Sequence, residues 1–190
     1  MNATDLPSSS MRQSIPLIDA RLLRPVLPGL LFGVLTLLFG FALGVVFGLN
    51  EDAIKSRLAA SAESVRVTVY QDDAGAIKGV LDKSWSYMQR AHLHAGSLGA
   101  VAVSLTIVLV LMGARPVVAR VLSLCLGVGA LAYAVFWMWA GFRAPGLGST
   151  GLAKESLAWL AIPSSGMVVA ATVAVALLLG RAAMSSRTSP

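Results

Sequence analysis

Four long segments of the chain, residues 25–49, 91–113, 117–142 and 155–180, are apolar and carry no charged side chain in their middle. An apolar helix of about 20 residues crosses the roughly 30 Å hydrocarbon core of a bilayer. Only 13% of all residues are charged, whereas a soluble domain usually carries about 25%. The pattern predicts an all-α bundle of four membrane-spanning helices, with the lipid bilayer as its surroundings.

The first of these segments follows a polar stretch, residues 1–24, that contains arginines. A basic start and one apolar run also describe a secretory signal peptide, but the apolar core of such a peptide has only about 7–15 residues. Because residues 25–49 form a longer run, we expect this segment to be retained as the first span.

Glycines recur every four or seven residues in the first predicted span, which places them along one helix face. They are Gly29, Gly33, Gly40, Gly44 and Gly48. Helices associate in lipid largely through close packing, which small residues allow. The stripe therefore predicts a tight contact with another helix, either in this chain, in another membrane subunit or in a second copy.

The long polar segment at residues 50–90 separates the first two predicted spans. Ile54, Leu58 and Val65 share one helix face, and residues 71–75 have the composition of a turn. We expect an extracytoplasmic, amphipathic helical hairpin here. Nothing breaks its second helix before Ala91, so that helix could also continue into the second span as one rod. A glycine-rich loop is predicted at residues 143–154 and a short tail at 181–190.

Arginines lie close to the span ends on the side that holds both termini. They are Arg12, Arg21, Arg24, Arg115, Arg120, Arg181 and Arg187. The two sides have nearly equal totals of Lys and Arg, so we weight the short elements that are rich in arginine. This predicts cytoplasmic termini in a bacterial-type inner membrane. The basic residues form no stripe, so no nucleic-acid partner is expected.

The only two histidines, His92 and His94, lie where the polar segment becomes the second span. Residues two apart on a helix point about 200° from each other, so the pair cannot easily hold one metal ion. His92 continues a stripe that includes Met88 and should face the bundle, with Gly96 and Gly99 on the same side. His94 shares another face with Tyr87 and Arg90.

Three interpretations of the histidines remain open. His92 could be an axial ligand of haem b, with Met88, water or another subunit as the second ligand. Met88, His92 and His94 could bind copper, since imidazole and thioether suit Cu(I). We prefer the third interpretation, in which both histidines are interfacial polar residues that donate or accept hydrogen bonds.

A further polar group is predicted at the same end, where Arg143, Lys154 and Glu155 could contact an anion. For Lys154 and Glu155 we prefer ordinary capping and anchoring, since a helix start favours Glu and a span end favours Lys. No catalytic residue is assigned. The sequence as a whole favours a non-catalytic accessory subunit of a larger membrane assembly, associating through the first span. The alternative is a redox module that uses His92 and His94 in quinol-linked electron transfer.

Overall fold

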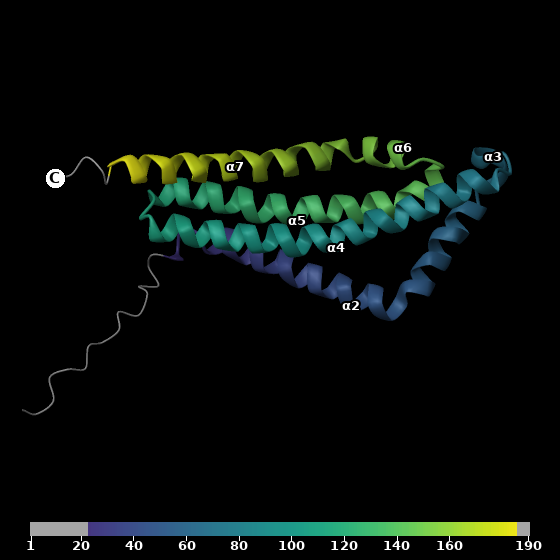
Figure 1. The fold of residues 1–190 in the computed structure, drawn as a ribbon, viewed down its shortest axis with the longest axis horizontal. Helices are drawn as coiled ribbons and strands as arrows, with labels where there is room; N and C mark the ends of the chain where they lie inside the picture. The colour runs from purple at the N-terminus through teal and green to yellow at the C-terminus, as the bar shows by residue number, and fades with distance from the viewer. Residues whose placement is uncertain (1–22, 186–190) are drawn as a thin grey trace, which may run out of the picture.

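The computed structural model describes residues 23–185, and helices make up nearly all of this range (Figure 1). The four long helices are α2 (Leu27–Glu63), α4 (Ala74–Leu111), α5 (Pro116–Leu147) and α7 (Ala158–Ser185). Two short helices, α3 (Arg66–Tyr70) and α6 (Thr150–Glu155), join them. Each long helix has the length and composition needed to cross a membrane. The predicted all-α bundle with four candidate spans is therefore confirmed.

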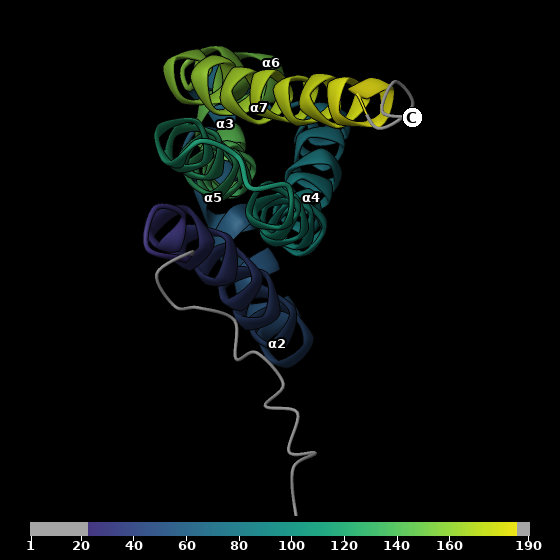
Figure 2. The ribbon, with the colours of Figure 1, turned by 90° about the vertical axis from the view of Figure 1, so that its left-hand side faces the viewer.

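Helix α5 lies at the centre of the bundle and contacts α2, α4 and α7. The antiparallel pair of α4 and α5 forms the middle of the molecule, with α2 on one side and α7 on the other (Figure 2). The turn between α4 and α5 is short because Gly113 adopts a positive φ of 62° and Pro116 begins the next helix. Helix α7 packs mainly against α5 and barely touches α4.

The bundle has two ends, which hold different elements of the chain. We call one the arginine end, which holds the start of α2, the α4–α5 turn and the end of α7. The other, the α3 end, holds α3, α6 and the helical segments that lead to them (Figure 1).

The polar segment between the first two spans is built from extensions of the spanning helices. Helix α2 continues to Glu63 through a kink at Asn50, where φ is −131° and ψ is 24°. Helix α4 runs unbroken from Ala74 into the second span, as the single-rod alternative predicted. Its start is capped by Asp73, whose Oδ1 accepts hydrogen bonds from the amides of Gly75 and Ala76 at 2.8 and 3.0 Å. The structure thus has two long helices joined by α3, where we expected a hairpin distinct from the spans.

The predicted glycine-rich loop at residues 143–154 is largely helical. Helix α5 extends through Pro145 to Leu147 and ends at Gly148, whose φ is 65°. Helix α6 follows at once because the Ser149 hydroxyl accepts hydrogen bonds from the amides of Gly151 and Leu152. Pro145 lies in the last turn of α5, where it removes one intrahelical hydrogen bond, and α5 ends two residues beyond it.

Glycines set the distance between the helices. A Cβ at Gly29 would overlap the backbone carbonyl of Ser123, and one at Gly127 would overlap the carbonyl of Gly29, so α2 and α5 meet backbone to backbone. An ideal Cβ at Gly129 would lie 2.8 Å from the carbonyl oxygen of Ser164 in α7. Such close approach is how helices gain packing energy within lipid.

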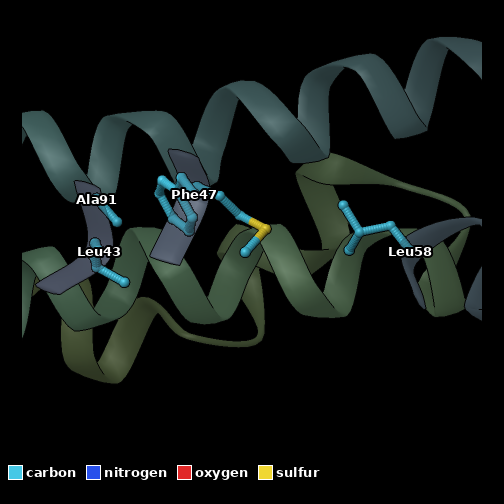
Figure 3. Close-up of a cluster of buried hydrophobic side chains, with 5 residues drawn as sticks. Leu43, Phe47, Leu58 and Ala91 are labelled. Carbon is cyan, nitrogen blue, oxygen red and sulfur yellow. The ribbon is translucent and has the colours of Figure 1, made fainter. Parts of the chain in front are cut away.

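Apolar side chains fill the space between α2, α4 and α5 near the kink. Leu43 and Phe47 of α2 lie close to Ala91 of α4, and Leu58, beyond the kink, closes the same cluster (Figure 3). Met88 belongs to this cluster and is only 1% exposed. The kink at Asn50 therefore brings the polar half of α2 back onto α4.

Candidate functional site

His92 lies between α4 and α2, against the glycine stripe. Its Nδ1 is 2.8 Å from the backbone carbonyl oxygen of Gly40. A carbonyl oxygen can only accept, so Nδ1 carries the proton and donates this hydrogen bond. An ideal Cβ at Gly44 would lie 2.9 Å from Cε1 of the ring. The imidazole thus occupies a notch that exists because position 44 has no side chain.

The other glycines of the stripe also contact helices of this chain. An ideal Cβ at Gly33 would lie 3.0 Å from Cγ2 of Val103, and one at Gly40 would lie 3.0 Å from the amide nitrogen of Gly96. Among the five glycines of the stripe, only Gly48 has no neighbouring atom within 4 Å of an ideal Cβ. The partner of the stripe, which the sequence left open, is therefore α4 together with α5.

His94 points to a different neighbour. Its ring centre lies 5.2 Å from that of Tyr133 and 6.0 Å from that of Trp137, both on α5. Trp137 in turn contacts Tyr87 edge-on at 4.9 Å. We call Tyr87, His94, Tyr133, Phe136 and Trp137 the aromatic cluster. The two histidines face different helices, as their spacing on α4 predicts.

Met88 lies in the apolar cluster and packs against Gly141 of α5, where an ideal Cβ would be 2.7 Å from its Cγ. Within residues 23–185, the structure brings together no group of three or more His, Cys, Asp and Glu side chains that could hold a metal ion. The proposed role of Met88, His92 and His94 in binding haem or copper stays a prediction.

Two basic side chains border the aromatic cluster. The Arg90 guanidinium carbon lies 5.1 Å from the ring centre of Trp137 and 5.5 Å from that of Tyr87. The Lys154 ammonium lies 5.8 Å from the same Tyr87 ring. Cations are attracted to the faces of aromatic rings, so Lys154 of α6 is drawn toward α4. In the described part of the chain neither cation forms an ion pair.

The predicted contact of Arg143, Lys154 and Glu155 with an anion stays a prediction. Lys154 and Arg90 both lie next to the Tyr87 ring, and none of the polar interactions of residues 23–185 joins Lys154 to Arg143 or Glu155. The position of Arg90 on the face of Tyr87 and His94 was visible in the sequence. The role of α6 in completing this arrangement was not, because it depends on how α5 ends.

Helix α3 is anchored on the end of α5. The Tyr70 hydroxyl donates a buried hydrogen bond of 2.8 Å to the carbonyl oxygen of Pro145. Burial raises the pKa of the Tyr70 phenol above its ordinary value of 10.0, because the charged form is poorly solvated there. A Cβ at Gly148 would overlap the side chain of Val69. Sequence reasoning missed this contact, which joins residues 75 positions apart.

A cavity of about 470 Å³ lies between the kinked half of α2 and α4. Lys55, Leu81 and Trp85 contribute to its lining, and the Lys55 ammonium lies 5.2 Å from the centre of the Trp85 ring. Lys55 also pairs with Glu51. The charge on this side chain is therefore already balanced within the chain.

The comparisons with known proteins give no family for this arrangement of helices. The chain matches no protein-family model, no curated protein and no solved structure. The helices themselves identify the chain as a small multi-pass membrane protein with four candidate spans.

Proposed function

We propose that the chain is a non-catalytic accessory subunit of a larger membrane assembly. The observation that carries this proposal is the exposure of α7. This helix is the least buried of the four candidate spans and packs mainly against one neighbour, α5. It exposes Gly166 and Ala170 four residues apart, and nothing lies within 4 Å of an ideal Cβ at Gly166. Small residues at this spacing favour close contact with another membrane helix.

The glycine stripe of α2 is a weaker candidate for the same contact than its sequence indicates. Gly29, Gly33, Gly40 and Gly44 are already covered by α4 and α5. We therefore assign the contact with other subunits to α7 in place of α2.

Two glycine-to-leucine variants test this assignment. Gly166→Leu should abolish co-migration with the partner subunits when native membranes are gently solubilised and separated under non-denaturing conditions. Gly48→Leu is the matched control, because this glycine also has nothing within 4 Å of an ideal Cβ, and it should leave the complex intact. Loss of the complex in Gly48→Leu alone would assign the contact to α2, and a chain that migrates by itself in both cases would refute the accessory role.

We also propose that both termini face the cytoplasm of a bacterial-type inner membrane. Arg24, Arg115, Arg120 and Arg181 lie at the arginine end, and basic residues near span ends favour the cytoplasmic side. In a Cys125→Ala background, a membrane-impermeant maleimide should label Lys78→Cys in intact cells and leave Met184→Cys unlabelled. The opposite pattern would reverse the orientation.

A redox module using His92 is the second candidate. The hydrogen bond from Nδ1 to Gly40 leaves Nε2 as the free acceptor, and metal-binding histidines commonly use a backbone carbonyl in this way. A Soret band, or stoichiometric copper lost in His92→Ala, would support this candidate. A colourless, metal-free protein that co-purifies with other subunits would support the accessory role.

A further inference from the structure

Two adjoining cavities lie at the arginine end. The first, of about 290 Å³, is lined by Arg24 and Pro25 at the start of α2 and by Pro116, Val117 and Arg120 at the start of α5. The second, of about 250 Å³, shares Pro25 and Pro116 with the first. Its other walls are apolar or small residues of α2, α4, α5 and the α4–α5 turn. A basic compartment and an apolar compartment thus meet at two prolines.

Among the described residues, the charged side chains that line the first cavity are both positive. Every Asp and Glu within residues 23–185 belongs to residues 51–82 or is Glu155, and these positions lie toward the α3 end. Arg24 and Arg120 are exposed and form none of the ion pairs of the described residues. An anion bound between them would meet no acidic side chain of this part of the chain.

The helix ends at this position have the same sign of charge. Neither Val26 before α2 nor Arg115 before α5 makes a side-chain capping bond. Unpaired amide groups give a helix start a partial positive charge. This adds to the field of the two arginines in the first cavity.

We propose that the two cavities together bind one anionic phospholipid. Its phosphodiester lies between Arg24 and Arg120, and the upper part of an acyl chain occupies the apolar cavity beside Leu109 and Ala119. Guanidinium groups bind phosphate oxygens well, and basic pockets at the ends of spanning helices are typical lipid headgroup sites. The apolar compartment assigns the phosphate to a lipid, since free phosphate would gain nothing from it.

Lipid binding to the full chain in neutral detergent tests the proposal. Dioleoyl phosphatidylglycerol, dioleoyl phosphatidylcholine and inorganic phosphate are added in turn, and retained lipid is measured by native mass spectrometry alongside thermal unfolding. Each basic residue near an anionic lipid changes the binding constant for that lipid about fivefold. Arg24→Gln and Arg120→Gln should each weaken phosphatidylglycerol binding by that factor, and the double variant by about thirtyfold.

Arg57→Gln combined with Lys83→Gln is the matched control, because it removes two exposed basic residues of the α3 end that form no ion pair among residues 23–185. It should bind phosphatidylglycerol as the wild type does. Ala114→Leu, which fills part of the apolar cavity, should weaken lipid binding while both arginines remain. If the Arg24/Arg120 double variant and the Arg57/Lys83 double variant lost phosphatidylglycerol binding equally, the site would be overturned. General attraction of anionic lipid to a basic protein would then explain the binding. Stabilisation by inorganic phosphate as large as by phosphatidylglycerol would overturn the assignment to a lipid.

Discussion

Replacing His92 by alanine removes the hydrogen bond that joins α4 to the carbonyl of Gly40. Hydrogen bonds between membrane helices contribute about 0.6 kcal/mol on average and up to about 1.7 kcal/mol. Emptying the notch at Gly44 adds roughly 1 kcal/mol for lost packing. We therefore expect His92→Ala to lower the free energy of unfolding by about 2 kcal/mol, measured by titrating detergent-solubilised protein with a denaturing detergent.

The same site allows a test of the geometry. The Nδ2 of an asparagine lies at the same position along the side chain as Nδ1 of histidine, so His92→Asn can keep the donor to Gly40. It should be clearly more stable than His92→Ala. A metal-binding role would not be retained in this variant, because asparagine has no counterpart of Nε2.

A double-mutant cycle isolates the contact between His92 and Gly44. A Cβ at position 44 would lie 2.9 Å from Cε1 of the imidazole, so Gly44→Ala should cost about 1–3 kcal/mol through overpacking. In the His92→Ala background the same change should no longer destabilise the protein, since the methyl group then enters the emptied notch. A coupling energy near zero, or a His92→Asn variant as unstable as His92→Ala, would refute the packing described for this histidine.

Three other changes test the contacts that hold the bundle together, each by thermal unfolding in detergent. Tyr70→Phe removes the hydrogen bond to Pro145 and should cost about 1 kcal/mol. The raised pKa of Tyr70 means that the folded state favours the neutral phenol, so the contribution of Tyr70 to stability should be constant below pH 10.0 and fall above it, and stability should fall less steeply there in Tyr70→Phe. Gly148→Ala places a side chain at a φ of 65° against α3 and should cost at least about 1–2 kcal/mol. Gly127→Ala forces α2 away from α5 and should destabilise by about 1–3 kcal/mol, whereas Gly79→Ala, which has open space, should stabilise by about 0.5–1 kcal/mol; equal effects would contradict the packing of α2 on α5.

The contacts at the α3 end explain why that end can be well ordered outside a spanning segment. Tyr70 and Val69 attach α3 to the end of α5, and Lys154 attaches α6 to α4 through Tyr87. The ion pairs of this end, such as that of Lys55 with Glu51, are exposed and join residues close in sequence, so each contributes little. The buried hydrogen bond and the close approach at Gly148 are therefore the contacts to weaken if this end is to be detached.

The presence of four long apolar helices and the face of the glycine stripe follow from the sequence alone. A helix in lipid needs a run of uncharged residues of a certain length, and the 3.6-residue repeat fixes which side chains share a face. These rules placed His92 toward the bundle and His94 on another face. They could not show how far α2 and α5 extend, because helical extensions outside the apolar runs depend on contacts such as the one between Tyr70 and Pro145.

Which helix lies opposite which is a property of the tertiary structure. Gly127 and Gly129 show no periodic stripe, because they are two residues apart and serve opposite neighbours, α2 and α7. The identity of the partner at Gly40 depends on the crossing of two helices 52 residues apart, and local sequence carries no record of that distance. The sequence by itself determined that four helices suit a lipid environment and which residues share each helix face. Both properties depend only on nearby residues, through the length of each apolar run and the 3.6-residue helical repeat. Only the tertiary structure decided that the glycine stripe packs against α4, including His92, and against α5, because close packing depends on the shapes of both surfaces at once.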